Sequence, residues 1–259
     1  GSLVTTVDGM RNAERFAKNF DRNPNVHIPR IVWEATTSRV LTLERIRGIK
    51  VSNLSALDAA GINRKTLAEQ IAQLNLQMVF EDGFFHADPH PGNFFIESDG
   101  RIGLIDFGMV GSLDSQTQEH LSGILLAVIS QDADRLVDAF LELGFAQQTV
   151  DRSLLRRDLQ YLISRYYGQP LGEISISRVL NNILEIVRRH HLQLPSNLSL
   201  FFKAGMINEG VVADLDPSVS ITTLLMPYVE KLLLRQYSPT LWAQRIGEAS
   251  LYAAQWGVE

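Results

Sequence analysis

Two carboxylates and one amide carry most of the chemistry that this sequence offers. Asp88 precedes Asn93 by five residues and Asp106 by 18. Carboxylate and amide oxygens are the ligands that hard cations such as Mg²⁺ prefer. Four acids and one base lie between positions 83 and 112, and this local charge of −3 would repel a polyphosphate unless a divalent cation intervened. We therefore expect a metal-dependent phosphate chemistry, with Asn93 and Asp106 as metal ligands.

The elements around these residues are expected to bring them together. Two prolines stiffen the loop between Asp88 and Asn93, and a glycine allows it to turn. The strand-like runs at residues 93–97 and 101–106 flank a hairpin-turn signal that ends in glycine. Because a hairpin carries the chain out and back, we expect Asp106 to return beside Asn93.

The joint spacing is more specific than its parts. Asp88 could accept a proton from a substrate hydroxyl while Asn93 and Asp106 hold a metal, as the catalytic loop and the Asp-Phe-Gly segment of protein kinases do. A lone Asp-Phe-Gly or a lone His-x-Asp would be weak evidence for such a site, because three-residue matches arise by chance. The competing interpretation is an acidic loop followed by a core strand. It explains Leu104 and Ile105, but not the two Phe-Phe pairs that flank a loop of Asp, His, Pro and Asn.

The segment His86–Asn93, together with Leu104–Gly108, resembles the UbiB/ADCK (aarF-domain) family of atypical protein-kinase-like proteins. Other segments are similar to the family's αC helix and following strand, its hinge and its later helices: residues 12–20, 28–34, 41–48 and 200–217. The resemblance implies an α+β, protein-kinase-like fold, with a mostly helical C-lobe, a small β-hairpin and a remnant of the N-lobe. We expect the N-lobe remnant at residues 1–47 and the C-lobe, with additional C-terminal helices, at residues 48–259.

The same resemblance implies roles for the site residues and names ATP and Mg²⁺ as cofactors. Asp88 takes the catalytic position, and Asn93 and Asp106 take the positions that bind the metal of MgATP. A hinge strand suits a planar base, because its N–H and C=O groups need no particular side chain. The adenine-contacting hinge would be the backbone of Glu44, Arg45 and Ile46.

The chain also departs from the family's pattern. It contains no Lys-x-Gly-Gln motif, Ala-rich phosphate loop or ATP-pairing lysine, and Gly9 stands where the αC glutamate is expected. The short run from Gly108 to a helix cap at Asp114 or Ser115 leaves no long activation segment. The Gly1-Ser2 start is typical of an expression scar. We therefore expect a fragment that lacks N-lobe elements and whose ATP affinity and turnover are low alone.

Composition narrows the remaining classes of protein. The 259 residues have a net charge of −5, which argues against a nucleic-acid partner, and no cysteine, which excludes a disulfide scaffold and a Cys-ligated zinc site. No run of residues reaches the 18 apolar positions that span a bilayer. His86 and His90 straddle Asp88, and we expect them to orient the loop by hydrogen bonds rather than to bind a metal.

Periodicity predicts the remaining elements. Short β-type runs are expected at residues 27–33 and 39–46, and a helix at residues 64–80. Helical periods dominate from about residue 114. The helices predicted there are 115–129, 132–144, 151–167, 177–192, 195–210, 221–236 and 239–256. Aromatic side chains on the amphipathic stretch 241–256 suit a membrane interface, although packing onto the C-lobe is the favoured interpretation.

Together these inferences predict an atypical kinase or ATPase. By the resemblance, it would bind MgATP and support prenyl-lipid (quinone) metabolism at a membrane, with membrane lipid or quinone-pathway proteins as partners besides ATP. We expect the full-length protein to be peripherally membrane-associated, and this chain alone to be soluble, in the cytoplasm or an organelle. Two alternatives stay open: a non-catalytic nucleotide-binding scaffold, or pseudokinase, and a phosphotransferase for a small hydroxylated substrate.

Overall fold

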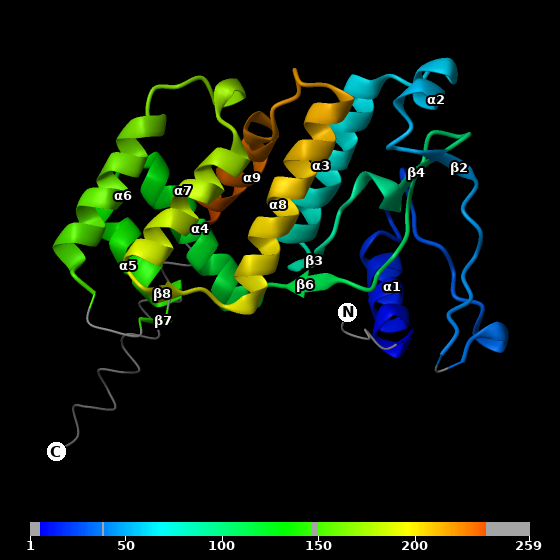
Figure 1. The fold of residues 1–259 in the computed structure, drawn as a ribbon, viewed down its shortest axis with the longest axis horizontal. Helices are drawn as coiled ribbons and strands as arrows, with labels where there is room; N and C mark the ends of the chain where they lie inside the picture. Colours follow the sequence, from blue (N-terminus) through cyan, green and yellow to red (C-terminus); the bar gives the residue numbers. More distant parts are fainter. Residues whose placement is uncertain (1–5, 38, 144, 147–149, 237–259) are drawn as a thin grey trace.

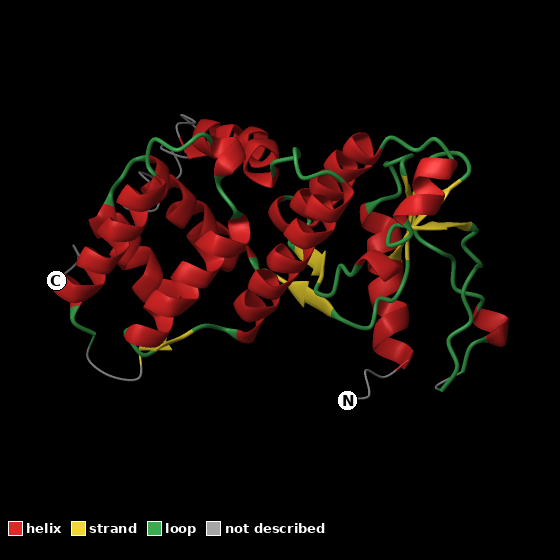
Figure 2. Cartoon of the chain, turned by 45° about the horizontal axis from the view of Figure 1, so that its top comes forward, coloured by secondary structure: helices red, strands yellow, loops and turns green. Residues whose placement is uncertain are grey.

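A small sheet and the helices α1 (Thr6–Asn19) and α2 (Leu54–Ala59) lie at one end of the molecule and a body of helices at the other, in the mixed α+β composition that was expected (Figure 1). The structure is a computed structural model that describes residues 6–37, 39–143, 145–146 and 150–236. Helices α3 (Arg64–Phe80) and α8 (Ser196–Leu215) pack side by side between the two ends (Figure 2).

The hairpin that was predicted after Asn93 is confirmed. Strand β4 (Phe94–Glu97) pairs antiparallel with β5 (Ile102–Leu104), with Phe94 opposite Leu104. Gly100 in the turn has a φ of +87°, which a residue with a side chain rarely adopts. Two short strands complete this sheet, whose order is β1-β5-β4-β2: β1 (Val26–His27) and β2 (Gly48–Lys50).

The prediction of two strands at residues 27–33 and 39–46 is largely wrong. The two segments share one isolated antiparallel bridge, between Ile31 and Leu43. Pro29 has no N–H to donate to a ladder, and a pair of strands without a buried face is marginally stable. The described residues between 28 and 47 therefore form a mostly irregular segment, in which the bridge keeps residues 27–33 and 39–46 in contact.

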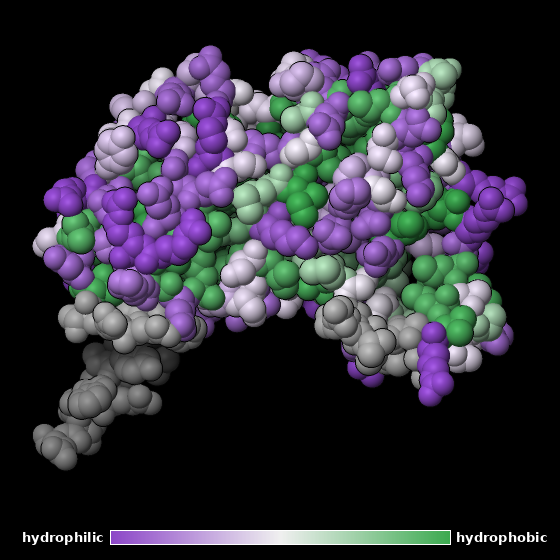
Figure 3. Space-filling view, viewed as in Figure 1, coloured by the Kyte–Doolittle hydropathy of each residue, from purple (hydrophilic) through white to green (hydrophobic). Residues whose placement is uncertain are grey.

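This irregular segment presents apolar side chains at the surface. Val32 is 37% exposed, Trp33 54% and Val40 55%. Figure 3 shows a hydrophobic patch at the lower right, where this segment lies in Figure 1. The exposure explains why β-branched and aromatic residues did not produce strands here: they have no core to pack against.

The predicted helices within the described residues are confirmed, and their caps follow the sequence signals. Asp114 accepts a hydrogen bond from the N–H of Thr117 at 2.7 Å, and Asp151 accepts one from Leu154 at 3.0 Å. The helix predicted at residues 239–256 lies outside the described residues. The helices are α1 (Thr6–Asn19), α2 (Leu54–Ala59), α4 (Ser115–Ile129), α5 (Ala133–Leu143), α6 (Arg152–Tyr166), α7 (Ile176–Arg189) and α9 (Ile221–Gln236). The remaining strands are β3 (Phe84–His86), β6 (Val110–Ser112), β7 (Phe145–Ala146) and β8 (Leu192–Gln193).

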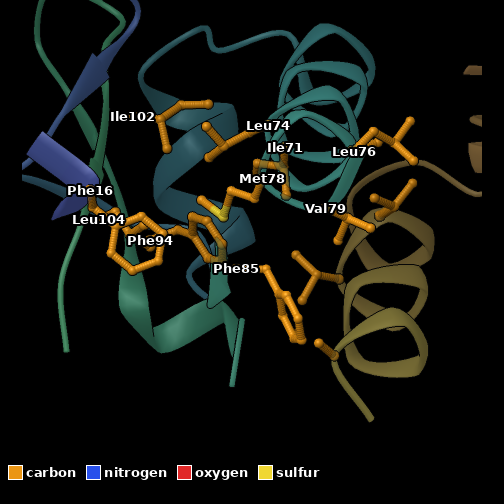
Figure 4. Packing of buried hydrophobic residues seen from close by; sticks show 14 of the residues in the cluster. Phe16, Ile71, Leu74, Leu76, Met78, Val79, Phe85, Phe94, Ile102 and Leu104 are labelled. Carbon is orange, nitrogen blue, oxygen red and sulfur yellow. The ribbon is translucent and has the colours of Figure 1, made fainter. Parts of the chain in front are cut away.

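The main hydrophobic core lies between α3 and the hairpin. Met78 of α3, Phe85 of β3 and Phe94 of β4 are each buried, and Figure 4 shows their side chains gathered in this space. Phe16 of α1 joins the same core. A second cluster of apolar side chains holds α4, α5, α6 and α7 together. The core that matters for the site is therefore the first, because it fixes the strands on either side of the catalytic loop.

Candidate active site

The predicted catalytic loop is anchored to the segment that follows Asp106. Strand β3, which precedes Asp88, pairs antiparallel with strand β6, which follows Asp106. The backbone N–H of Ala87 then donates to the carbonyl of Met109 at 3.0 Å. Asp88 comes next, with a side chain that is 37% exposed. The loop therefore begins from a fixed backbone and presents the Asp88 carboxylate where a substrate can reach it.

The side chain of His86 connects the catalytic loop to the segment that carries Asp106. Its Nδ1 accepts the backbone N–H of Asp88 at 3.1 Å, and its Nε2 lies 3.4 Å from the carbonyl of Ile105. Because Nδ1 accepts a hydrogen bond and Nε2 faces a carbonyl oxygen, the proton of the neutral ring lies on Nε2. Burial lowers the pKa of His86, which keeps the imidazole neutral. His90 likewise accepts the N–H of Gly92 at 3.2 Å, so the prediction that both histidines orient the loop is confirmed.

Asn93 is hydrogen-bonded to Asp88 and to Ile105, the residue before Asp106. Its Nδ2 donates to the carbonyl of Asp88 at 3.1 Å, and its own carbonyl accepts the N–H of Ile105 at 3.0 Å. The predicted return of the chain beside Asn93 is therefore confirmed. Because the amide nitrogen is used inside the protein, the Oδ1 of Asn93 remains as the atom that can bind a cation.

Asp106 adopts an unusual backbone conformation. Its φ is +62°, in the left-handed region that residues other than glycine rarely enter. Its Oδ1 accepts the N–H of Gly108 at 3.2 Å. The next residue, Phe107, is buried against the ring of Phe16 with centroids 5.3 Å apart, and its carbonyl accepts Nδ2 of Asn12 at 2.9 Å. Helix α1 thus fixes the neighbour of Asp106 and supports the strained conformation.

The oxygen donors fit a magnesium ion that is shared with phosphate. Within the described ranges, no group of three or more His, Cys, Asp or Glu side chains could hold a metal ion. Mg²⁺ is commonly held by one or two protein oxygens, with phosphate oxygens and water completing its shell. Asn93 and Asp106 offer an amide oxygen and a carboxylate, which matches that requirement.

Lys203 of α8 is a site residue that the sequence reasoning did not identify. Its Nζ lies 3.5 Å from Oδ1 of Asp88. Arg101, the one base in the dense motif, instead pairs with Glu97 at 3.1 Å and Asp99 at 2.7 Å. Lys203 is more than a hundred residues from Asp88 along the chain, so no local spacing signals their contact.

The predicted hinge lies along the irregular segment. The N–H of Glu44 donates to the carbonyl of Arg30 at 2.8 Å, and the backbone N–H of Arg30 lowers the pKa of the Glu44 carboxyl by donating to it. In the part of the chain that is described, Arg45 and Ile46 make no backbone–backbone hydrogen bond. The side chain of Ile46 covers Gly103, where a Cβ would lie 2.7 Å from Cγ2 of Ile46. The hinge therefore lies beside β5, and the backbone of Arg45 and Ile46 is not used in backbone pairing among the described residues.

A cavity of about 420 Å³ lies away from these residues, between α3, α9 and the strands β1 and β5. Carboxamide side chains line much of it: Asn23, Asn25, Gln70, Gln73 and Gln77. None of the predicted site residues lines this cavity. We place the candidate site at Asp88, Asn93 and Asp106, because the carboxylate and amide donors and the hydrogen bonds of the catalytic loop lie there and not in this cavity.

Comparisons with known proteins identify the family of this chain. Residues 9–140 match the family described as the ABC1 atypical kinase-like domain, and residues 159–220 match the UbiB helical domain. A probable protein kinase UbiB of Xanthomonas euvesicatoria is 32% identical over 257 residues, which cover 96% of this chain and 46% of that protein. The uncharacterized protein sll1770 of Synechocystis is 34% identical over 224 residues, covering 86% of this chain and 38% of that protein.

A solved structure shares the fold. It is the complex of Rv3197 with erythromycin from Mycobacterium tuberculosis, with a TM-score of 0.58 at 21% identity, covering 85% of this chain and 56% of that one. The chain spans less than half the length of the two curated relatives named above. The predicted kinase-like fold class is confirmed, whereas the boundary predicted between residues 47 and 48 stays a prediction.

Proposed function

Because the chain belongs to the ABC1 atypical kinase-like (UbiB) family, we propose that it binds MgATP and transfers or hydrolyses the γ-phosphoryl group. One observation carries the proposal. Asn93 bonds both to the backbone of Asp88 and to the residue before Asp106, which supports a shared site for the proton acceptor and the two proposed metal ligands.

Each residue of the site has a separate task in this proposal. The carboxylate of Asp88 accepts the proton of the attacking hydroxyl or water. The Oδ1 of Asn93 and the carboxylate of Asp106 hold Mg²⁺, which when bound neutralises charge on the phosphate oxygens. The free backbone groups of Arg45 and Ile46 bind the adenine. His86 keeps the loop in register, since its neutral ring joins the backbones on both sides of the site.

The cellular role is proposed on the family resemblance. We place the activity in prenyl-lipid (quinone) metabolism at a membrane, with lipid or quinone-pathway proteins as partners. Over the described residues, no helix is both long enough and apolar enough to cross a bilayer. The amphipathic stretch 241–256, on which a peripheral contact was considered, lies outside those residues.

One observation favours a second candidate, a nucleotide-binding scaffold without catalysis. Gly9 lies within α1 at the position where the family's pattern has the αC glutamate. A helix that lacks this carboxylate cannot pair with an ATP-binding lysine, so binding without turnover is the natural alternative.

Calorimetric titration with ATP, with and without Mg²⁺, tests the proposal. Titrations should extend into the millimolar range, because binding is expected to be weak. We expect binding that requires Mg²⁺ and that is lost in Asp106→Asn. Asp99→Asn is the matched control, since Asp99 lies in the same hairpin but pairs with Arg101.

Three outcomes separate the candidates. Mg²⁺-dependent binding with phosphate release supports the enzyme, and the same binding without phosphate release supports the scaffold. Binding that is indifferent to Mg²⁺, or unchanged in Asp106→Asn, contradicts the proposed site.

A further inference from the structure

Lys203 places a positive charge against the proposed catalytic carboxylate. Its Nζ lies 3.5 Å from Oδ1 of Asp88, with side chains that are 46% and 37% exposed. Among the described residues, it is the only basic side chain in an ion pair with Asp88 or Asp106. The nearest base in sequence, Arg101, is already occupied by two acids of the hairpin. Lys203 is therefore the cation that a phosphate at this site would meet.

The backbone that carries Lys203 is held rigidly against the catalytic loop. The ring of Phe201, two residues before Lys203, meets the ring of Phe85 edge to face, with centroids 6.1 Å apart. Phe85 lies in β3, two residues from the start of the loop. Further along α8, Oδ1 of Asn208 accepts Nδ2 of Asn75 on α3 at 2.9 Å. The position of α8 is thus coupled to the strand and the helix that support Asp88.

The ammonium group itself keeps capacity for another ligand. It has three N–H donors, and Asp88 occupies at most one of them in a long contact. Half of the side chain remains exposed, so a phosphate can approach without displacing a buried group. A transferring phosphoryl group carries charge on its three outer oxygens, which a preorganised cation stabilises more strongly as transfer proceeds.

We propose that Lys203 is a further catalytic residue, which binds the γ-phosphoryl group of ATP while remaining beside Asp88. This inference rests on the proposed phosphoryl-transfer function. In the step, the bond between the γ-phosphorus and the β,γ-bridging oxygen breaks, and a bond forms to the attacking oxygen. The proton of the attacking group passes to Asp88, ADP leaves with the bridging oxygen, and Lys203 keeps its proton throughout.

The test compares ATP with ADP, because only ATP carries the group that Lys203 would contact. We expect Lys203→Met to weaken MgATP binding by roughly 10-fold while leaving MgADP binding unchanged, since a charge-assisted hydrogen bond is lost. Phosphate release should fall by about 100-fold. Lys203→Arg should retain part of the preference for ATP, because it restores the charge.

Lys231→Met is the matched control. Lys231 is also a half-exposed lysine paired with one acid, with its Nζ 2.8 Å from Oε1 of Glu81, and it lies away from the site. The control should keep the preference for ATP over ADP. Thermal unfolding of both variants should match the unsubstituted chain, because exposed ion pairs contribute little to stability.

The outcomes distinguish this inference from the function on which it rests. An unchanged ratio of ATP to ADP affinity in Lys203→Met, in a chain that binds MgATP, overturns the role of Lys203 alone. Equal losses for ATP and ADP also overturn it, because they indicate a general effect on the site. A chain that binds neither nucleotide in the presence of Mg²⁺ contradicts the proposed function itself.

Discussion

Replacing Gly111 with alanine tests how the core sets the distance between the catalytic loop and α8. A Cβ at this position would lie 2.1 Å from Cζ of Phe85 and 2.6 Å from its Cε2, closer than real Cβ atoms approach other atoms. Phe85 is 1% exposed, so its ring cannot turn into solvent to make room. The ring must therefore shift within the core, where it meets the ring of Phe201 on α8, and we expect the shift to disturb the seating of α8 and Lys203.

The size of the effect follows from overpacking in a closed core. Forcing an extra methyl group into such a site costs about 1–3 kcal/mol. For a chain of this length, each kcal/mol lowers the melting temperature by roughly 2–4 °C. We expect Gly111→Ala to lower the free energy of unfolding by this amount, measured by urea denaturation followed by circular dichroism. The same variant should weaken MgATP binding, because Lys203 and Asp88 are no longer held together.

Gly123 provides the control for the same chemical change. It lies within α4, and, apart from its two chain neighbours and the nearby backbone of the helix, no atom lies within 4 Å of its would-be Cβ. Gly123→Ala should therefore stabilise the protein by up to about 1 kcal/mol, because alanine favours the helix. Adding Phe85→Leu to Gly111→Ala should recover part of the loss. If Gly111→Ala is as stable as the unsubstituted chain, the proposed contact between Gly111 and Phe85 is refuted.

Two further predictions concern groups next to the site. Burial raises the pKa of Asp82 from 3.8 to about 6, and its Oδ2 has no hydrogen-bond partner in the described part of the chain. The unfolded chain releases this proton more readily, so stability should fall as pH rises from about 4 to about 6. Urea titrations should show that Asp82→Asn raises the free energy of unfolding by about 1 kcal/mol at pH 8 and leaves it unchanged at pH 4. The difference is reduced by the partial exposure of the side chain. Asn12→Ala removes the bond to the carbonyl of Phe107 and should cost about 1 kcal/mol; equal urea midpoints would contradict that role.

The local part of the site could be predicted from the sequence. The turn glycine and the alternating hydrophobic runs were enough to place Asp106 beside Asn93, and the structure joins the two through Ile105. Helix caps could also be predicted from the sequence, because Asp114 accepts a hydrogen bond from a backbone N–H only three residues away. These features depend on neighbours in sequence, where residue type and spacing decide the geometry.

The long-range part could not be predicted in this way. Lys203 reaches Asp88 only because α8 packs on α3 and on Phe85, and no periodicity encodes which face of one helix meets another. The strands expected at residues 27–33 and 39–46 failed for a related reason. The residue types at these positions favour strands, but Trp33 lies at the surface, where a strand gains no burial.

The most direct test of the central claim is to locate a paramagnetic cation. Mn²⁺ can replace Mg²⁺ and broadens the NMR signals of nearby nuclei. In the presence of ATP, we predict selective broadening of the Asn93 side-chain amide and of the Gly108 N–H, which lies 3.2 Å from Oδ1 of Asp106. The amide signals of Gln73 and Gln77, in the cavity between α3 and α9, should be broadened less than these two. Broadening centred on that cavity, or none near Asn93 and Gly108 when ATP is present, would contradict the account.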